Sequence, residues 1–272
     1  MGSPSATTLS EPSIAGTFAA LRQQGRPALI PYLTAGFPDL RASEDALRAA
    51  DEVADILEVG VPFSDPLADG PTIQRSTFQA LQQGMTLTGT LELIARCQPR
   101  RPVVVFSYLN PILRYGLDRF LGDAGSLGIA GLLLTDLPAG SDPAVEDAVR
   151  RSPLDLIRLI APTTRPERLA AAVDGAEGFV YLVARLGVTG ASRALAADLT
   201  DSVARVRAAT SLPVAVGFGI SNAEQAAAVG RLADGVVVGS ALVDVLGNGG
   251  VAAAGRFLRE LRGALDLAPA VA

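Results

Sequence analysis

An apolar segment followed by a helical segment recurs about eight times along this chain, and that alternation constrains its fold most. The expected strands cover residues 28–34, 55–60, 102–108, 128–136, 154–160, 178–183, 213–217 and 235–238. Apolar strands of this kind are suited to burial on both faces, as in a parallel sheet. About eight such units in 272 residues favour a single-domain α/β protein with a (β/α)8 fold, a TIM barrel, over an open sheet.

Segments with helical spacing fill the intervals between these strands. An extra helix is expected over 13–24, ahead of the first strand, with Gly25 as its C-cap. The others cover residues 40–50, 72–83, 87–97, 110–121, 142–151, 166–173, 198–209, 222–229, 241–246 and 251–265. Residues 1–12 lack the regions of a signal peptide and are typical of a flexible tail. The barrel domain is therefore expected to span 13–268.

Composition excludes several classes of function. A net charge of −5 without a basic cluster argues against binding to nucleic acid. No apolar run reaches the ~18 residues that a membrane span needs. Cys97 is the single cysteine, so no disulfide can form within the chain, and a reducing compartment, the cytoplasm, fits. We expect a cytoplasmic protein that contacts neither nucleic acid nor membrane.

The chain contains no histidine. That absence removes the Ser-His-Asp and Cys-His catalytic arrangements and histidine-based metal sites. Acid–base chemistry near neutral pH must then come from carboxylates, tyrosines or amine-like groups whose pKa values are shifted by their surroundings.

Glu58 is the carboxylate best placed for such chemistry. It lies inside an apolar run, directly before a loop that contains Asp69. Burial there should raise the pKa of Glu58, because desolvation disfavours the charged form. The alternative is a structural acid paired with the backbone or an arginine. Asp69, taken alone, could equally be a turn-forming residue.

Other polar side chains fall at the carboxyl ends of the strands, where TIM barrels place their active sites. They are Tyr108, Asp136, Thr163 and Tyr181. Tyr181 could instead be a core residue whose hydroxyl does not reach the barrel mouth.

Glycine-rich turns after the last strands predict a phosphate site. The sequence GFGIS follows the seventh strand at 217–221, and Gly239-Ser240 opens a helix after the eighth. Glycines let the backbone approach phosphate oxygens, and a helix N-terminus favours a dianion. The alternative is that these are only tight turns. The loop at 184–193 could close over a bound ligand as a lid or could be an ordinary exposed loop.

Several motifs resemble the tryptophan synthase α-chain family. The longest is LEVGVPFSDPLADGPTIQ at 57–74; the others are IPYLTAGFP at 30–38, NPILRYG at 110–116, TDLP at 135–138, APTT at 161–164, YLVARLGVTG at 181–190, GFGIS at 217–221 and VVGSA at 237–241. The resemblance implies a TIM-barrel lyase that cleaves indole-3-glycerol phosphate into indole and glyceraldehyde 3-phosphate, the α reaction of L-tryptophan biosynthesis. It also implies that no organic cofactor and no metal is used.

The resemblance assigns roles to particular residues. Glu58 would be the acid/base carboxylate, and Asp69 would accept the indole N–H and stabilise positive charge on the ring. Tyr181 would position Glu58, and Thr189 would link the 184–193 loop to Asp69. The remaining substrate contacts would come from Tyr32, Tyr108, Thr163 and Phe218, and phosphate contacts from Gly190, Gly219, Gly239 and Ser240.

Family members usually act with a β subunit that carries pyridoxal phosphate. Residues 63–71 and the region around 110–111 would face that partner. The chain departs from the expected pattern at Ala184, Leu186 and Thr135. These departures leave open a standalone paralogue that releases free indole. Two further alternatives are a weakly active subunit that mainly activates a β partner and another phosphate-binding barrel of the same pathway.

Overall fold

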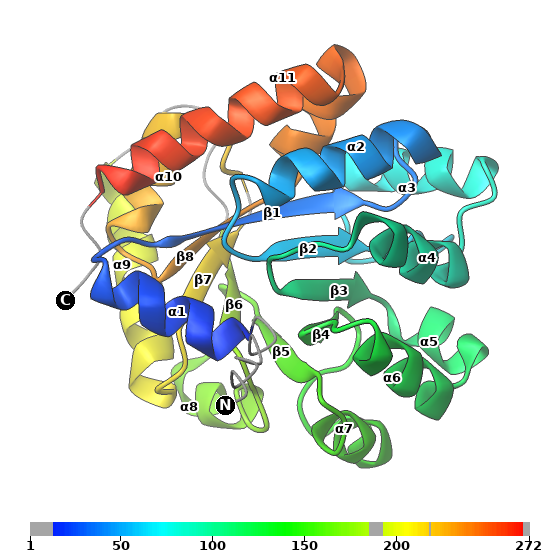
Figure 1. Cartoon of the computed structure of the whole chain (residues 1–272). Helices are drawn as coiled ribbons and strands as arrows, with labels where there is room; N and C mark the ends of the chain where they lie inside the picture. Colours follow the sequence, from blue (N-terminus) through cyan, green and yellow to red (C-terminus); the bar gives the residue numbers. More distant parts are fainter. Residues whose placement is uncertain (1–12, 185–192, 218, 269–272) are drawn as a thin grey trace, which may run out of the picture.

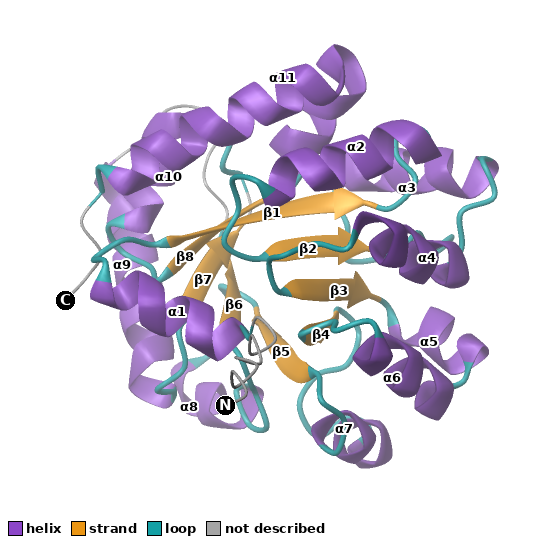
Figure 2. Cartoon of the chain, viewed as in Figure 1, coloured by secondary structure: helices purple, strands orange, loops and turns teal. Residues whose placement is uncertain are grey.

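The computed structural model describes residues 13–184, 193–217 and 219–268. Within them, eight parallel strands close into a barrel in the order β1 to β8, and helices surround the barrel (Figures 1 and 2). The predicted TIM barrel with an additional N-terminal helix is therefore confirmed. The expected tail at 1–12 and most of the 184–193 loop lie outside the described residues, so the domain limits of 13–268 stay a prediction.

The strands and helices follow the expected order. The strands are β1 Ala28–Thr34, β2 Leu57–Gly60, β3 Val103–Ser107, β4 Gly131–Leu134, β5 Asp155–Ile160, β6 Val180–Val183, β7 Val214–Gly217 and β8 Gly235–Val238. The helices are α1 Ile14–Gln23, α2 Leu40–Asp51, α3 Pro71–Gln82, α4 Leu87–Cys97, α5 Leu109–Tyr115, α6 Leu117–Ser126, α7 Pro143–Arg150, α8 Pro166–Ala172, α9 Arg193–Ala209, α10 Ala223–Gly230 and α11 Ser240–Asp266. Among these helices none has the length and hydrophobicity to cross a membrane.

Several expected elements differ from the structure. The single helix expected at 110–121 is wrong: Gly116, at φ 98°, separates α5 from α6. The second strand begins at Leu57 rather than at residue 55. Asp55 instead uses its carboxylate, which accepts the Leu29 N–H at 2.9 Å and pairs with Arg262 at 2.7 Å. The two helical segments expected at the C-terminus are joined in α11 across a kink at Gly250.

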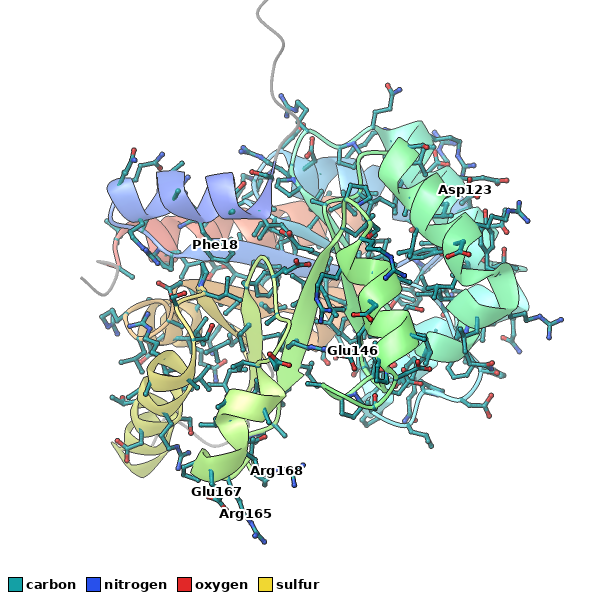
Figure 3. The ribbon with its side chains drawn as sticks, turned by 90° about the horizontal axis from the view of Figure 1, so that it is seen from below. Phe18, Asp123, Glu146, Arg165, Glu167 and Arg168 are labelled. Carbon is teal, nitrogen blue, oxygen red and sulfur yellow. The ribbon has the colours of Figure 1, made fainter. Side chains whose placement is uncertain are left out.

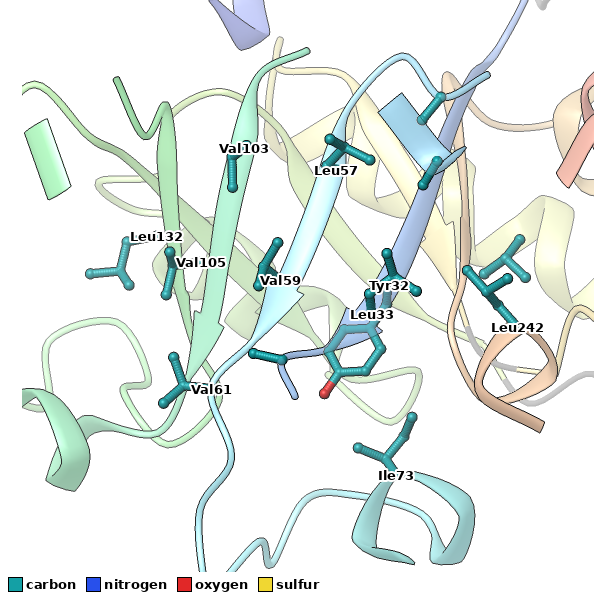
Figure 4. Close-up of a cluster of buried hydrophobic side chains, with 14 of the residues drawn as sticks. Tyr32, Leu33, Leu57, Val59, Val61, Ile73, Val103, Val105, Leu132 and Leu242 are labelled. Carbon is teal, nitrogen blue, oxygen red and sulfur yellow. The ribbon is translucent and has the colours of Figure 1, made fainter. Parts of the chain in front are cut away.

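The core has two parts, one on each side of the barrel wall. Side chains that face outward, such as Leu57, Val59, Val103 and Val105, pack against the surrounding helices (Figure 4). Side chains that face inward form a second cluster, and Ile14, Phe18 and Leu21 of α1 belong to it.

Helix α1 lies beside the ends at which the strands begin (Figure 1). Phe18, labelled in Figure 3, contacts the inward-facing Phe179, with ring centroids 5.8 Å apart. The Ser13 side chain accepts the Gly16 N–H at 3.1 Å and caps the start of this helix. The amino-terminal end of the barrel is thus filled with apolar side chains, which leaves the opposite end for a ligand.

Candidate active site

The cavity that holds both predicted catalytic carboxyls, Glu58 and Asp69, lies at the carboxyl ends of the strands. Its volume is about 280 Å³, near the lower end of the range for small-molecule sites. It is lined by Tyr32, Glu58, Asp69, Gly70, Ile73, Phe106, Tyr181, Gly219, Ile220, Ser221, Gln225, Val237, Gly239, Ser240, Ala241 and Asp244. Alternation along the strands places five of them there, because every second side chain points into the barrel: Tyr32, Glu58, Phe106, Tyr181 and Val237. The others come from the loops and helices that follow the strands.

Glu58 is fully enclosed at the floor of this cavity. It is only 1% exposed, and neither carboxyl oxygen has a hydrogen-bond partner among the described residues. Burial raises its pKa from the ordinary 4.5 to about 8. The carboxyl is therefore mostly protonated at neutral pH. The alternative of a structural acid paired with an arginine or the backbone finds no support in this part of the chain.

Two tyrosines flank Glu58, and each has its hydroxyl where only a glycine, without a Cβ, leaves enough room. Tyr32, labelled in Figure 4, lies on β1 as the register partner of Glu58, and its ring packs edge-on against Phe106 with ring centroids 5.3 Å apart. Its hydroxyl lies over Gly60, where an added Cβ would stand 2.1 Å away. The Tyr181 hydroxyl lies over Gly217 in the same way, also at 2.1 Å. Tyr181 makes no hydrogen bond to Glu58 here, so its positioning role stays a prediction.

Gly60→Ala should therefore disturb both stability and substrate binding. The rigid, buried Tyr32 ring has to move, which should cost about 1–3 kcal/mol of unfolding free energy and raise KM because the ring lines the cavity. Denaturant unfolding and steady-state kinetics measure the two effects. Gly122→Ala is the matched control: its Cβ would meet nothing within 4 Å, so stability should be unchanged or rise by about 0.4–1 kcal/mol. Unaltered stability and KM in Gly60→Ala would contradict this packing.

Asp69 is held by contacts within and around its loop. The Tyr108 hydroxyl accepts the neighbouring Ala68 N–H at 2.8 Å, and the Tyr108 ring packs against Phe63 at 5.2 Å. Gln74 donates to the Asp69 carbonyl at 2.9 Å. Burial raises the pKa of the Asp69 carboxyl to about 6, and the nearby Tyr108 hydroxyl opposes that rise. Asp69 is therefore mostly ionised at neutral pH while Glu58 is not, the separation expected from their positions.

The opposite side of the cavity presents backbone groups suited to an anion. Gly219 adopts φ 84°, a conformation that favours glycine, and it lines the cavity together with Gly239 and Ser240. Helix α11 begins at Ser240, and no side chain caps it. Its first N–H groups and its dipole are thus available to a negatively charged ligand. The structure brings together three of the four predicted phosphate-binding glycines and serines; Gly190 lies outside the described residues.

The remaining predicted site residues are placed differently. Tyr108 does not line the cavity and acts on the Asp69 loop instead. Thr163 is exposed between β5 and α8, in a region from which Arg165 and Arg168 project into solvent, and it does not line the cavity (Figure 3). Asp136 accepts the Leu109 N–H at 2.8 Å and so caps α5. Thr189 and Phe218 lie outside the described residues.

Sequence reasoning missed some cavity residues. Phe106 and Val237 could have been found from strand alternation, since each lies two residues from another inward-facing position. Asp244 could have been found from its spacing, because it follows Ser240 by one helical turn. Ile73 and Gln225 reach the cavity because of how α3 and α10 pack, and the sequence around them does not predict that packing.

A TIM barrel with two carboxyls of separated pKa at its mouth, opposite an open helix N-terminus, defines an acid–base enzyme that acts on an anionic small molecule. Comparisons with known proteins specify which one. The sequence profile described as "Tryptophan synthase alpha chain" matches residues 18–260. The chain belongs to the tryptophan synthase alpha chain family, and this makes it an enzyme of the carbon–carbon lyase class.

Individual relatives agree with this assignment. The tryptophan synthase alpha chain of Synechococcus elongatus is 47% identical over 261 residues, which cover 94% of this chain and 98% of the relative. A structure of Mycobacterium tuberculosis tryptophan synthase superposes with a TM-score of 0.86 at 42% identity, covering 94% of this chain and 100% of that one. Tryptophan synthase subunit alpha from Legionella pneumophila gives 0.84 at 33% identity, covering 93% and 98%.

Proposed function

We propose that this chain catalyses the α reaction of tryptophan synthase, the retro-aldol cleavage of indole-3-glycerol phosphate to indole and glyceraldehyde 3-phosphate. The observation that carries the proposal is the enclosed Glu58 carboxyl, without a hydrogen-bond partner in the described part of the chain, in one cavity with Asp69 and the open N-terminus of α11. L-tryptophan biosynthesis is the corresponding pathway, and the cytoplasm is the expected location for this family of soluble biosynthetic enzymes.

Glu58 would serve as acid and then as base. Because its pKa is about 8, it begins protonated and can donate its proton to C3 of the indole ring. The resulting carboxylate then accepts the proton of the hydroxyl on the adjacent glycerol carbon. As the bond between that carbon and C3 breaks, its electrons return to the ring and the hydroxyl carbon becomes the aldehyde. Glu58 is left protonated, ready for the next cycle.

Asp69 would stabilise the intermediate between these steps. Protonation at C3 places positive charge on the indole nitrogen, and an ionised carboxylate that accepts the N–H lowers the energy of that state. A pKa of about 6 keeps Asp69 charged at neutral pH. The two carboxyls thus have different roles: Glu58 transfers a proton, and Asp69 supplies a negative charge.

The other proposed residues bind the phosphate, flank the indole ring or support the Asp69 loop. Gly219, Gly239 and Ser240 would bind the phosphate from the backbone side, with Gly190 as a fourth contact predicted from the sequence. Tyr32 and Phe218 would flank the indole ring, and Tyr181 would border the reacting atoms. Tyr108 would act through the Asp69 loop, whose Ala68 N–H it binds. Thr189 stays a contact proposed from the sequence, whereas Thr163, which is exposed and does not line the cavity, is not assigned a substrate contact.

A tryptophan synthase β subunit is the proposed protein partner. Leu67, in the 63–71 segment, is 95% exposed, and Leu113 of α5, near Asn110 and Pro111, is 49% exposed. Two exposed leucines do not by themselves mark an interface. They support the proposal because they lie on or beside the two segments that the family resemblance assigns to this partner. Both lie on segments that follow the carboxyl ends of β2 and β3, the end of the barrel that holds the cavity. Binding there could act directly on the loop that carries Asp69.

Indole release from indole-3-glycerol phosphate, followed with and without a purified β subunit, tests the proposal. We expect indole and glyceraldehyde 3-phosphate in equal amounts, at a rate that rises when the β subunit is present. A high rate that the β subunit does not change would indicate a standalone lyase. Absence of indole under both conditions would overturn the proposed function.

A further inference from the structure

The described lining of the cavity is rich in acids and lacks any basic side chain. Three carboxyl residues, Glu58, Asp69 and Asp244, line it, and none of the described lining residues is an arginine. The chain contains no lysine at all. A phosphate dianion that enters this cavity therefore meets negative charge, and Asp244 lies at the end where the phosphate is expected.

Asp244 belongs to the helix proposed to bind the phosphate. It follows Ser240 by four residues on α11, so the two side chains lie on the same face of the helix, one turn apart. An ionised carboxylate at this distance opposes a dianion at the helix N-terminus, and its own side chain is half exposed. Unless it is neutralised, Asp244 works against the helix dipole that attracts the phosphate.

Arg75 supplies the opposite charge from a different element. It lies on α3, the helix that follows the Asp69 loop, and its Nη2 is 3.2 Å from Oδ1 of Asp244. Thr72 Oγ1 donates to Oδ2 of the same carboxylate at 3.2 Å and accepts from Arg75 Nη2 at 3.0 Å. The three side chains form a closed set of contacts between α3 and α11 at the border of the cavity.

We infer that Arg75 is a charge-balancing residue for phosphate binding: by pairing with Asp244 it neutralises the carboxylate one turn from the phosphate site and holds it against α3. This inference rests on the proposed function, because it names a determinant of phosphate affinity in that same cavity. Arg75 does not touch the reacting atoms. Its effect should appear in the binding of phosphorylated ligands and leave the chemical step nearly unchanged.

The net charge of the pair sets the expected order of affinities. The pair is neutral in the wild type, −1 in Arg75→Gln, +1 in Asp244→Asn and neutral again in the double variant. A unit charge about one helical turn from a dianion in a solvated site corresponds to an affinity change of about 3- to 10-fold, reduced by salt. Affinity for a phosphorylated ligand should therefore be highest in Asp244→Asn, equal in the wild type and the double variant, and lowest in Arg75→Gln.

Calorimetric titration of these four proteins with glycerol 3-phosphate, at low and high ionic strength, tests the inference. We expect Kd to rise about 3- to 10-fold in Arg75→Gln, to return to within about twofold of wild type in the double variant, and to depend less on the variant at high salt. Binding of indole, which has no phosphate, should not follow this order. Thr72→Val, which removes a contact without a charge, should bind glycerol 3-phosphate within about twofold of wild type.

Two results would overturn the inference. One is a double variant that binds as weakly as Arg75→Gln, which would mean that Arg75 acts by direct contact or by packing. The other is an unchanged Kd in Arg75→Gln. The proposed function is judged separately, by indole release in the wild type, whereas these titrations need no turnover. Failure of one can thus be distinguished from failure of the other.

Discussion

Glu58→Gln is expected to lower kcat for indole release by about 10²- to 10⁴-fold, the range that a general acid–base group contributes. Glutamine has nearly the same shape as the protonated side chain, so the cavity should keep its form, but it can neither donate a proton to C3 nor accept one from the glycerol hydroxyl. Steady-state kinetics in the presence of the β subunit measure the loss, and calorimetric melting at pH 6 checks that the variant is folded.

The matched control is Glu92→Gln. Glu92 is an exposed glutamate on α4, away from the cavity, and its side chain is 64% exposed. Its substitution should leave kcat within about twofold of wild type, as for most surface changes. Turnover at the wild-type rate in Glu58→Gln would remove Glu58 from the proton transfer.

Asp69→Asn is expected to lower kcat by about 10²- to 10³-fold, the range for loss of one preorganised electrostatic group. Asparagine can still accept the indole N–H through its side-chain oxygen, but it carries no charge to stabilise the protonated ring. The loss should therefore appear in kcat more than in KM. Kinetics of the two parameters with indole-3-glycerol phosphate separate these effects.

Asp65→Asn is the control within the same loop. Asp65 is exposed, accepts a hydrogen bond from Ser64 at 2.5 Å, and does not line the cavity. We expect its kcat in the absence of the β subunit to stay within about threefold of wild type. If Asp65→Asn and Asp69→Asn lose activity equally, the loss comes from a disturbed loop and not from the missing charge.

The strands and the burial of Glu58 could be predicted from the sequence, because both follow from the apolar residues next to them in the chain. Successive side chains of a strand point to opposite faces, so Glu58 lies on the face opposite to that of Leu57 and Val59 whatever the distant contacts are. Gly116 is a weak signal for a helix end, because glycine also occurs inside helices; the positive φ at this glycine shows the break between α5 and α6.

Long-range pairs could not be predicted. That Glu58 has no hydrogen-bond partner among the described residues depends on every neighbouring strand at once. The bond from Ala68 to Tyr108 joins residues 40 positions apart, and the contacts of Asp244 with α3 join residues about 170 apart. Asp55 shows the same limit, since its charge is balanced by Arg262 at the far end of the chain.

The raised pKa of Glu58 also links activity to stability. A carboxyl whose pKa rises from 4.5 unfolded to about 8 folded stabilises the fold fully below pH 4.5, and this contribution is lost as the pH rises through 8. Glu58→Gln has no such titration. It should match the wild type near pH 4.5 and be the more stable protein above pH 8, by a margin of the order of 5 kcal/mol. Denaturant unfolding at several pH values measures the difference, and equal stability at all pH values would contradict it.

Direct titration of the Glu58 carboxyl in the ligand-free protein tests the central claim most closely. Infrared difference spectra between the wild type and Glu58→Gln, recorded from pH 4 to 10, isolate the C=O stretch of this one protonated acid. A protonated signal that persists through neutral pH and disappears with a midpoint of about 8 is the predicted result. A midpoint near 4.5 would contradict it, because Glu58 would then be a carboxylate at neutral pH with no proton to give.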